Sequence, residues 1–148
     1  MNKQDAMTIR SARKQDWPQI RVLLQSNALP LDGADVHIAD FLVAEKDGAI
    51  CGCAGLEYHG AFALLRSCAV DHHNRGHGVG RELVRRTISS AQARSIIQIV
   101  LLTNTAEQYF LQFGFQTITR ADVPEELRAT EQFHTSCPTT ATVMRLIT

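Results

Sequence analysis

The sequence predicts one α/β domain in which helices pack on a mixed, mostly antiparallel sheet. The length of 148 residues suits a single compact domain, and no repeat or linker divides it, so we expect the domain to span residues 1–148. Short apolar runs typical of strands alternate with segments of helical periodicity. Three consecutive strands are joined by tight turns, which is the pattern of an antiparallel sheet.

The first third of the chain is predicted to hold a strand, a helix and a loop. Residues 7–10 have the pattern of a short strand. Asp16 is placed to cap the following helix, and Pro18 lies in its first turn, where the missing N–H costs little. The apolar residues at helical spacing are Trp17, Ile20, Leu23 and Leu24. Residues 29–39 are predicted to form a loop and a short helix.

Three strands and a long helix are predicted next. The strands cover residues 41–45, 49–58 and 62–70, and Asp47-Gly48 is a strong hairpin signal between the first two. The third strand is apolar nearly throughout, which predicts burial on both faces. A polar, glycine-rich loop then leads into a helix whose apolar residues are Val79, Leu83, Val84, Ile88 and Ala91.

The last third begins with a nearly all-apolar strand at residues 96–102. Thr105 and Gln108 have the spacing of a capping box, which predicts a helix over residues 106–113. Gly114 is expected to end that helix with a left-handed residue. Two further strands and a short helix are expected at residues 115–119, 143–147 and 122–130.

Charge and composition exclude several classes of protein. Fifteen basic and fifteen acidic residues give a net charge of zero, which argues against a nucleic-acid partner. The N-terminus is polar, and no apolar run approaches the roughly 18 residues that span a bilayer, so neither secretion nor a membrane partner is expected. The four cysteines lack zinc-finger spacing. We expect a cytoplasmic protein with reduced thiols and no metal.

The clearest functional signal is Arg75-Gly76-His77-Gly78-Val79-Gly80, between a buried strand and a long helix. Glycines let the backbone turn tightly and approach a ligand. Successive N–H groups and the positive end of the helix dipole then point at one site, which suits a pyrophosphate. The GxGxxG spacing of dinucleotide-binding loops and the Lys-Ser/Thr pair of P-loops are both missing. A plain glycine-rich connector is the structural alternative.

The pattern Arg75-x-x-Gly78-x-Gly80 resembles the R/Q-x-x-G-x-G/A acetyl-coenzyme A signature of the GNAT superfamily of N-acetyltransferases. The resemblance covers nearly the whole chain, including Cys68-Ala69-Val70 and Phe113-Gly114-Phe115. It implies the fold of that superfamily, a mixed sheet splayed at its centre with the help of a β-bulge. It also implies acetyl-CoA as cosubstrate, an amine as acceptor, no metal, and homodimers as a frequent assembly.

In that superfamily the loop amides grip the pyrophosphate, the splayed strand binds the pantetheine arm, and a later segment lines the other side of the arm. A backbone N–H near Cys68 is then expected to polarise the thioester carbonyl. The resemblance assigns to the coenzyme site Cys68, Ala69, Val70, Arg75, Gly76, His77, Gly78, Val79, Gly80, Arg81, Asn104, Ala106 and Phe110.

A narrower resemblance rests on several segments that occur together. They are similar to those of arsenic-resistance N-acetyltransferases of the ArsN type and, more distantly, of the acetyltransferase domain of N-acetylglutamate synthases. This implies an amino-acid-like acceptor, with an arsenic-containing glutamate analogue as one candidate. The segments are Leu65-Arg66-Ser67-Cys68-Ala69-Val70, Leu101-Leu102-Thr103-x-Thr105-Ala106-Glu107, Val123-Pro124-x-x-Leu127-Arg128, Phe133, Ser136-Cys137-Pro138 and Met144-Arg145-Leu146.

Acetyl transfer needs one group that takes a proton from the amine and one that protonates the leaving thiolate. Glu57 is predicted to take the amine proton, directly or through water; the alternative is an ordinary strand-end carboxylate in solvent. Many family members place a tyrosine four residues before the Gly-Phe pair, where this chain has Phe110, and Tyr109 lies one residue earlier. One residue rotates a helical side chain by about 100°. Either Tyr109 reaches the sulfur by local adjustment, or water protonates it.

Arg66 interrupts an otherwise apolar strand, and a buried guanidinium needs an anionic partner. We predict that Arg66 grips a carboxylate of the acceptor; the alternative is a structural ion pair with Glu57 or another strand carboxylate. Arg128 and His134 are candidates for the opposite wall of the acceptor site, or else surface residues.

His72, His73 and His77 surround the glycine loop, where we expect phosphate or solvent contact rather than a metal. Cys51 and Cys53 are predicted to point to the same side of their strand as small core residues. A thiol pair that binds trivalent arsenic is the alternative.

The leading interpretation is direct acetyl transfer, within a ternary complex, to the α-amine of a small amino-acid-like acceptor. One rival acetylates a protein N-terminus or lysine, which needs an open groove where residues 122–138 are expected to cover the site. Other rivals are a non-catalytic acyl-CoA sensor, which Phe110 supports, and a metalloid-binding module.

Overall fold

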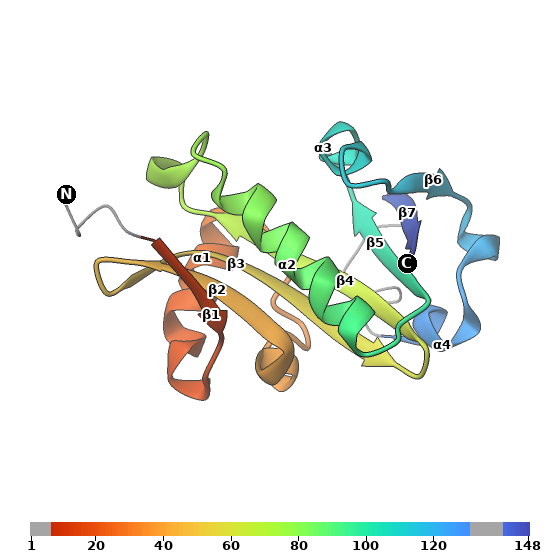
Figure 1. The fold of residues 1–148 in the computed structure, drawn as a ribbon, viewed down its shortest axis with the longest axis horizontal. Coiled ribbons are helices and arrows are strands. Elements are labelled where there is room, and N and C mark those ends of the chain that lie inside the picture. Colours follow the sequence, from red (N-terminus) through yellow and green to blue (C-terminus); the bar gives the residue numbers. More distant parts are fainter. Residues whose placement is uncertain (1–6, 131–140) are drawn as a thin grey trace.

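The computed structural model describes residues 7–130 and 141–148, and within them seven strands form one sheet. The sheet order is β1-β2-β3-β4-β5-β7-β6, with every neighbouring pair antiparallel except β4 and β5 (Figure 1). The mixed, mostly antiparallel sheet predicted from the sequence is confirmed. The strands are β1 (Met7–Ser11), β2 (Phe41–Lys46), β3 (Ala49–His59), β4 (Phe62–Val70), β5 (Gln98–Thr103), β6 (Gln116–Ile118) and β7 (Thr142–Ile147).

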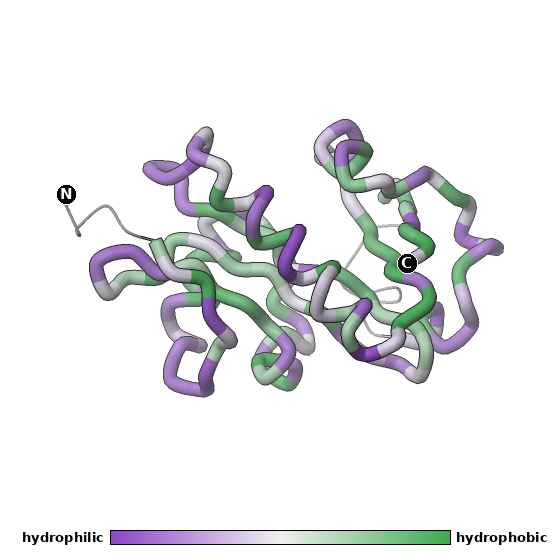
Figure 2. Tube along the Cα trace, in the orientation of Figure 1, coloured by the Kyte–Doolittle hydropathy of each residue, from purple (hydrophilic) through white to green (hydrophobic). Residues whose placement is uncertain are grey.

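Helices cover both faces of the sheet (Figure 1). On one face, α2 places Leu83 and Val84 against the strands, and on the other α1 places Ile20 and Leu24. Figure 2 shows the strands as mainly hydrophobic and the outer side of α2 as hydrophilic. No helix in the described residues is long and apolar enough to cross a membrane. The helices are α1 (Trp17–Ser26), α2 (Val79–Ala93), α3 (Glu107–Leu111) and α4 (Glu125–Arg128), with 3-10 turns η2 (Lys14–Asp16), η3 (Asp35–Asp40), η4 (His72–Asn74) and η5 (Arg120–Asp122).

The sheet opens between β4 and β5. These strands pair only over Phe62–Leu64 and diverge beyond that point (Figure 1). On its other edge β4 has a bulge, because Ser67 and Cys68 lie opposite the single residue Ala54 of β3. The φ of Ser67 is 59°, a left-handed conformation that costs a non-glycine residue about 1–2 kcal/mol. The splayed sheet implied by the family resemblance is therefore present, and the bulge lies where it opens.

An ion-pair group ties β1 to the start of α1. Arg10 donates to both carboxylate oxygens of Asp16, at 2.8 and 3.0 Å, and to Glu45 at 3.2 Å. The hydrogen bond from Arg10 holds the pKa of Asp16 at about 2, because it stabilises the ionised carboxylate. This arrangement contradicts the prediction that Asp16 caps α1: its carboxylate accepts the backbone N–H of Arg13 at 2.7 Å and no amide of α1.

The capping box expected at the start of α3 is also wrong. The backbone N–H of Ala106 donates to the hydroxyl of Thr103 at 3.0 Å, and no side chain of Thr105 caps the helix. Thr103 is the last residue of β5, so its hydroxyl lies under the turn that the chain makes into α3. The Thr103 hydroxyl, on a residue that precedes the helix, thus accepts the hydrogen bond of the Ala106 amide.

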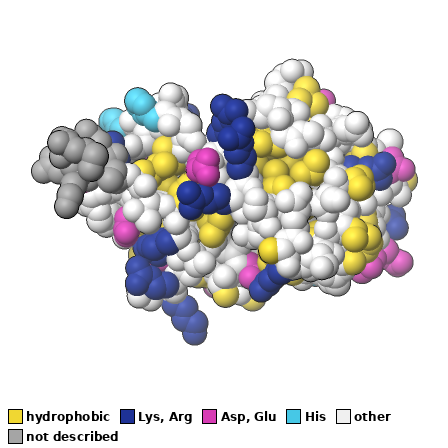
Figure 3. All heavy atoms as spheres, in the orientation of Figure 1, with side chains coloured by type: hydrophobic (Ala, Val, Ile, Leu, Met, Phe, Trp, Pro, Cys, Tyr) yellow, Lys and Arg dark blue, Asp and Glu magenta, His cyan; other side chains and the backbone are white. Residues whose placement is uncertain are grey.

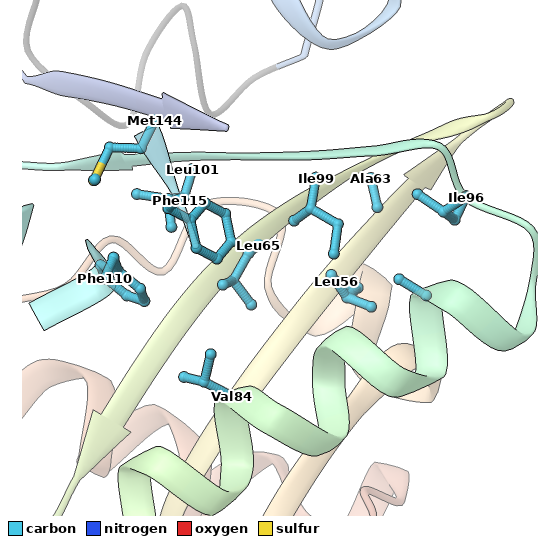
Figure 4. Close-up of a cluster of buried hydrophobic side chains, with 11 residues drawn as sticks. Leu56, Ala63, Leu65, Val84, Ile96, Ile99, Leu101, Phe110, Phe115 and Met144 are labelled. Atoms are coloured by element: carbon cyan, nitrogen blue, oxygen red, sulfur yellow. The ribbon is translucent and has the colours of Figure 1, made fainter. Parts of the chain in front are cut away.

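A hydrophobic cluster joins α2, the central strands and the C-terminal part of the chain (Figure 4). Leu56 of β3 and Leu65 of β4 face Val84 of α2, while Phe115 and Met144 close the cluster from the far side (Figure 4). This packing holds β4 between α2 on one side and Phe115 and Met144 on the other. The backbone around Ser67 and Cys68 therefore has a rigid support.

The packing on the face of the sheet that α1 covers can be tested at Gly55, which lies against Phe41. A Cβ at this position would lie 2.2–2.5 Å from atoms of the Phe41 ring. We expect Gly55→Ala to lower the free energy of unfolding by about 2–3 kcal/mol, because the buried ring must be displaced from its packed position in the core. Denaturant unfolding measures the effect. Adding Phe41→Leu should recover part of the loss, whereas strictly additive losses would contradict the predicted clash.

Candidate functional site

The glycine loop and the start of α2 form an anion-binding geometry. Gly76 and Gly78 have φ values of 82° and 79°, which turn successive amides toward the same side. Gly78 immediately precedes α2, and no side chain caps the helix there. The first-turn amides of a 15-residue helix are therefore available, with its dipole behind them. Histidine and basic side chains gather along this upper edge of the molecule (Figure 3).

A cavity of about 670 Å³, here called the glycine-loop cavity, lies beside this loop and extends along the end of β4 to α3. Ten of the thirteen residues assigned to the coenzyme by resemblance line it, whereas His77, Asn104 and Phe110 do not. Its volume is in the range of small-molecule sites. The lining residues are Asn27, Cys53, Ala54, Cys68, Ala69, Val70, Asn74, Arg75, Gly76, Gly78, Val79, Gly80, Arg81, Leu83, Val84, Ala106, Tyr109 and Gln112.

Tyr109 lines the glycine-loop cavity, despite the one-residue shift in the sequence pattern. Its hydroxyl lies 3.0 Å from the position that a Cβ on Gly80 would take. Burial raises the pKa of Tyr109, so the hydroxyl keeps its proton at neutral pH and can donate it. Phe110 points instead into the core and toward a second cavity.

This second cavity, of about 860 Å³, is here called the Arg66 cavity. It is lined by the loop after α1, by residues of β4 from Leu65 to Cys68, and by the segment from the end of β5 into α3. Four residues line both cavities, so the two meet at one junction: Asn27, Cys68, Arg75 and Ala106. Desolvation raises the pKa of the Cys68 thiol at this junction to about 12, so it stays protonated.

The side chain of Arg66 is 1% exposed and has three different environments for its nitrogens. Nη1 donates to Glu57 Oε2 at 2.6 Å, and Nε donates to the hydroxyl of Ser67 at 3.1 Å. Nη2 is buried and has no hydrogen-bond partner among the described residues. The ion pair with Glu57, which was the structural alternative, is therefore present. It leaves one guanidinium nitrogen uncompensated on a residue that lines the Arg66 cavity.

Glu57 is buried behind Arg66 rather than exposed in solvent. Its second oxygen, Oε1, lies 3.4 Å from Nε2 of His37 and 3.3 Å from Nε2 of His59. Glu57 lines neither of the two cavities. Its role as proton acceptor for the amine stays a prediction, while its contact with Arg66 makes it a positioning residue for the guanidinium.

Arg75 links the glycine loop to the loop after α1. Its Nε donates to the carbonyl of Val70 at 3.3 Å, and its Nη2 donates to the side-chain oxygen of Asn27. Asn27 is oriented for this contact, because its amide nitrogen donates to the carbonyl of Leu23 at 2.9 Å. The loop that follows Asn27 forms one wall of the Arg66 cavity.

Several residues singled out from the sequence lie elsewhere. Arg128 is exposed and lines neither of these two cavities, since Leu127 beside it is the residue that α4 buries. His134 lies outside the described residues. His72, His73 and His77 are exposed, and no cluster of His, Cys, Asp or Glu in the described part of the chain is arranged to hold a metal.

The prediction that Cys51 and Cys53 share one side of β3 is wrong. The pairing of β2 with β3 skips Cys51, because Ala44 lies opposite Gly52 and Glu45 opposite Ile50. Cys51 packs in a cluster with residues of α2, and Cys53 in a cluster with residues of α1. They are small core residues, and the irregular pairing is invisible in the alternation of the sequence.

The polar residues of these cavities that sequence reasoning missed include Asn27 and Asp32. Both lie where the sequence predicts a helix followed by a loop, and this pattern does not indicate a binding site. The contact of Asn27 with Arg75 joins residues 48 positions apart, so no local pattern indicates it. The position of Asp32 depends on how the loop folds against α1.

The chain matches the model of an acetyltransferase (GNAT) domain over residues 37–117, which is more than half of its length. It is 30% identical over 132 residues to an amino-acid acetyltransferase of Mycobacterium tuberculosis, covering 80% of this chain and 74% of the relative. It is 28% identical over 142 residues to an amino-acid acetyltransferase of Neisseria meningitidis, covering 85% of this chain. The chain spans only 31% of the length of that relative.

Solved structures share the fold. An N-acetylglutamate synthase from Neisseria gonorrhoeae, complexed with coenzyme A and N-acetyl-glutamate, superposes with a TM-score of 0.83 at 24% identity, covering 98% of this chain and 36% of that one. A Mycobacterium tuberculosis protein in complex with CoA superposes with a TM-score of 0.81 at 24% identity, covering 95% of this chain and 99% of that one. At this identity the similarity establishes the architecture.

Proposed function

Because the chain belongs to the GNAT acetyltransferase family, we propose that it transfers the acetyl group of acetyl-CoA to the amine of a small, carboxylate-bearing acceptor. The observation that carries the proposal is the junction of two cavities at Cys68 and Ala106. One cavity suits the coenzyme, and the other presents Arg66. The amino-acid acetyltransferases among the relatives support the same substrate class.

The glycine-loop cavity fits acetyl-CoA. The uncapped N-terminus of α2 and the left-handed Gly76 and Gly78 suit a pyrophosphate. The slot between β4 and β5 suits the pantetheine arm, since neither strand uses the other as a partner beyond Leu64. Gly80 leaves room beside the Tyr109 hydroxyl, which lies 3.0 Å from the position that a Cβ on Gly80 would take.

The Arg66 cavity fits an anionic acceptor. Glu57 and Ser67 fix two of the guanidinium nitrogens, and Nη2 still needs an acceptor atom. A carboxylate that enters the cavity meets this need after a small adjustment of the wall, and a charged hydrogen bond of this kind is strong. Amines without a carboxylate leave Nη2 uncompensated.

The transfer needs no covalent enzyme intermediate. The neutral amine attacks the carbonyl carbon of the thioester, the C–N bond forms and the C–S bond breaks. We propose that Tyr109 donates a proton to the leaving thiolate. Tyr109 then regains a proton from the nitrogen that has formed the new amide. One further proton, from the original ammonium, is released to solvent.

Free-thiol release from acetyl-CoA tests the proposal against a panel of amino acids, glutamate analogues including organoarsenicals, polyamines and short peptides. We expect release with amino acids and little with peptides. The narrower resemblance supports including the organoarsenicals. Release with peptides alone favours a protein acetyltransferase, and tight coenzyme binding without any release favours an acyl-CoA sensor.

A further inference from the structure

The loop between α1 and η3 supplies the one carboxylate among the described residues that line the Arg66 cavity. This is Asp32, an exposed residue on the wall formed by Ala28, Leu29 and Pro30. The other charged residues of the lining are Arg66 and Arg75, both cations. An acceptor with a positive amine and a negative carboxylate therefore finds a group of each sign in this cavity.

The loop that carries Asp32 is held in place at several points. The backbone N–H of Leu29 donates to the carbonyl of Leu24 at 2.9 Å, and that of Ala34 donates to Leu31 at 3.0 Å. Ala34 is fully buried, and Leu29 and Leu31 pack against the cluster around α1. These contacts fix the position of the loop backbone on either side of Asp32.

Other candidates for taking the proton of the amine are less suitable. The Cys68 thiol at the junction is a poor base, because desolvation raises its pKa to about 12 and keeps it protonated. Glu57 lines neither cavity, and its oxygens face Arg66, His37 and His59. Arg66 and Arg75 are cations and cannot accept a proton.

We propose that Asp32 binds the ammonium group of the acceptor and takes its proton before the attack on the thioester. This inference rests on the proposed acetyl transfer and assigns the residue that begins it. The ammonium gives one proton to the Asp32 carboxylate, directly or through one water, and the neutral amine then forms the C–N bond. Asp32 returns that proton to solvent, while the second proton of the nitrogen ends on the thiol of coenzyme A.

The test compares Asp32→Asn with wild type by thiol release, with the most active amino acid of the panel as acceptor. At pH 7 we expect kcat/KM to fall about a hundredfold, the usual contribution of a general base. At pH 9.5 the deficit should shrink to about tenfold or less, because a larger fraction of the amine is already neutral in solution. A residue with only a structural role would give the same deficit at both pH values.

Three further variants make the result specific. Asp35→Asn is the matched control, since Asp35 is also an exposed carboxylate of this region but lines none of the described cavities, and it should behave as wild type. Asp32→Glu should recover part of the activity. Coenzyme A affinity, measured by calorimetry, should stay unchanged in all of them and shows that each variant is folded.

Two outcomes overturn the inference and differ from each other. The first outcome is wild-type activity of Asp32→Asn at both pH values, or a pH-dependent deficit in Glu57→Gln and none in Asp32→Asn. Either result would show that Asp32 does not take the proton, while acetyl transfer itself would still be supported. Absence of thiol release by the wild type with every amino acid would overturn the proposed function and this inference with it.

Discussion

Arg66→Lys is expected to lower kcat/KM for a carboxylate-bearing acceptor by about a thousandfold, with coenzyme A affinity unchanged. Lysine keeps a positive charge beside Glu57, but its single nitrogen cannot serve Glu57, Ser67 and a substrate carboxylate together. Loss of one partner from a buried charged hydrogen bond costs about 2–5 kcal/mol, which covers this factor. The loss should appear mainly as a higher KM for the acceptor.

The matched control is Arg10→Lys. Arg10 is likewise an arginine in an ion pair, with Asp16 and Glu45, but it lies on β1 and lines none of the described cavities. The Arg10→Lys variant should have a lower free energy of unfolding, with unchanged KM for the acceptor and for acetyl-CoA. If Arg66→Lys keeps the wild-type KM for every carboxylate acceptor, Arg66 serves only its ion pair with Glu57.

Gly78→Ala is expected to weaken coenzyme A binding by about a hundredfold. Gly78 has a φ of 79°, and open space surrounds the position of a Cβ, so the cost comes from the backbone and not from a clash. Alanine at this φ costs about 1–2 kcal/mol, and relaxation toward negative φ turns the loop amides away from the anion. Calorimetric titration with coenzyme A measures the affinity.

Gly48→Ala provides the control for backbone strain. Gly48 has a φ of 80° and likewise nothing near its Cβ position, but it lies in the hairpin between β2 and β3. Both variants should lose a similar amount of unfolding free energy, and only Gly78→Ala should lose affinity for the coenzyme. Equal affinities in the two variants would show that the loop does not hold the pyrophosphate.

The elements that the sequence predicted well are those with local signals. Asp47-Gly48 does form the turn between β2 and β3, and the apolar periodicity of residues 79–91 does correspond to α2. The glycine pattern correctly placed a tight loop before that helix. These features depend on residues a few positions apart, which a single sequence displays.

The remaining features depend on contacts between distant residues. The contact of Arg66 with Glu57 arises from the pairing of β3 with β4, where the bulge at Ser67 sets the register. The extra residue at Cys51 likewise arises from the pairing with β2. The alternation of apolar residues cannot reveal such irregularities, because they shift the facing of a side chain without changing its type.

The residues of the Arg66 cavity could likewise be predicted only in part from the sequence. Its wall combines the loop after α1, β4 and the segment before α3, and only the fold brings Asp32 and Asn104 to the same cavity. The sequence identified Arg66 because a cation in an apolar strand is unusual. It offered no comparable signal for Asp32, an ordinary aspartate before a glycine in a loop.

In the proposed reaction, the acceptor carboxylate is recognised in the Arg66 cavity while the acceptor amine receives the acetyl group. The most direct test measures kcat/KM by thiol release for an amino acid and for the amine that lacks only its α-carboxylate. We expect the amino acid to be preferred by about a hundredfold or more, as for the loss of one buried charged hydrogen bond. Equal values for the two compounds, or release with the decarboxylated amine alone, would contradict the account.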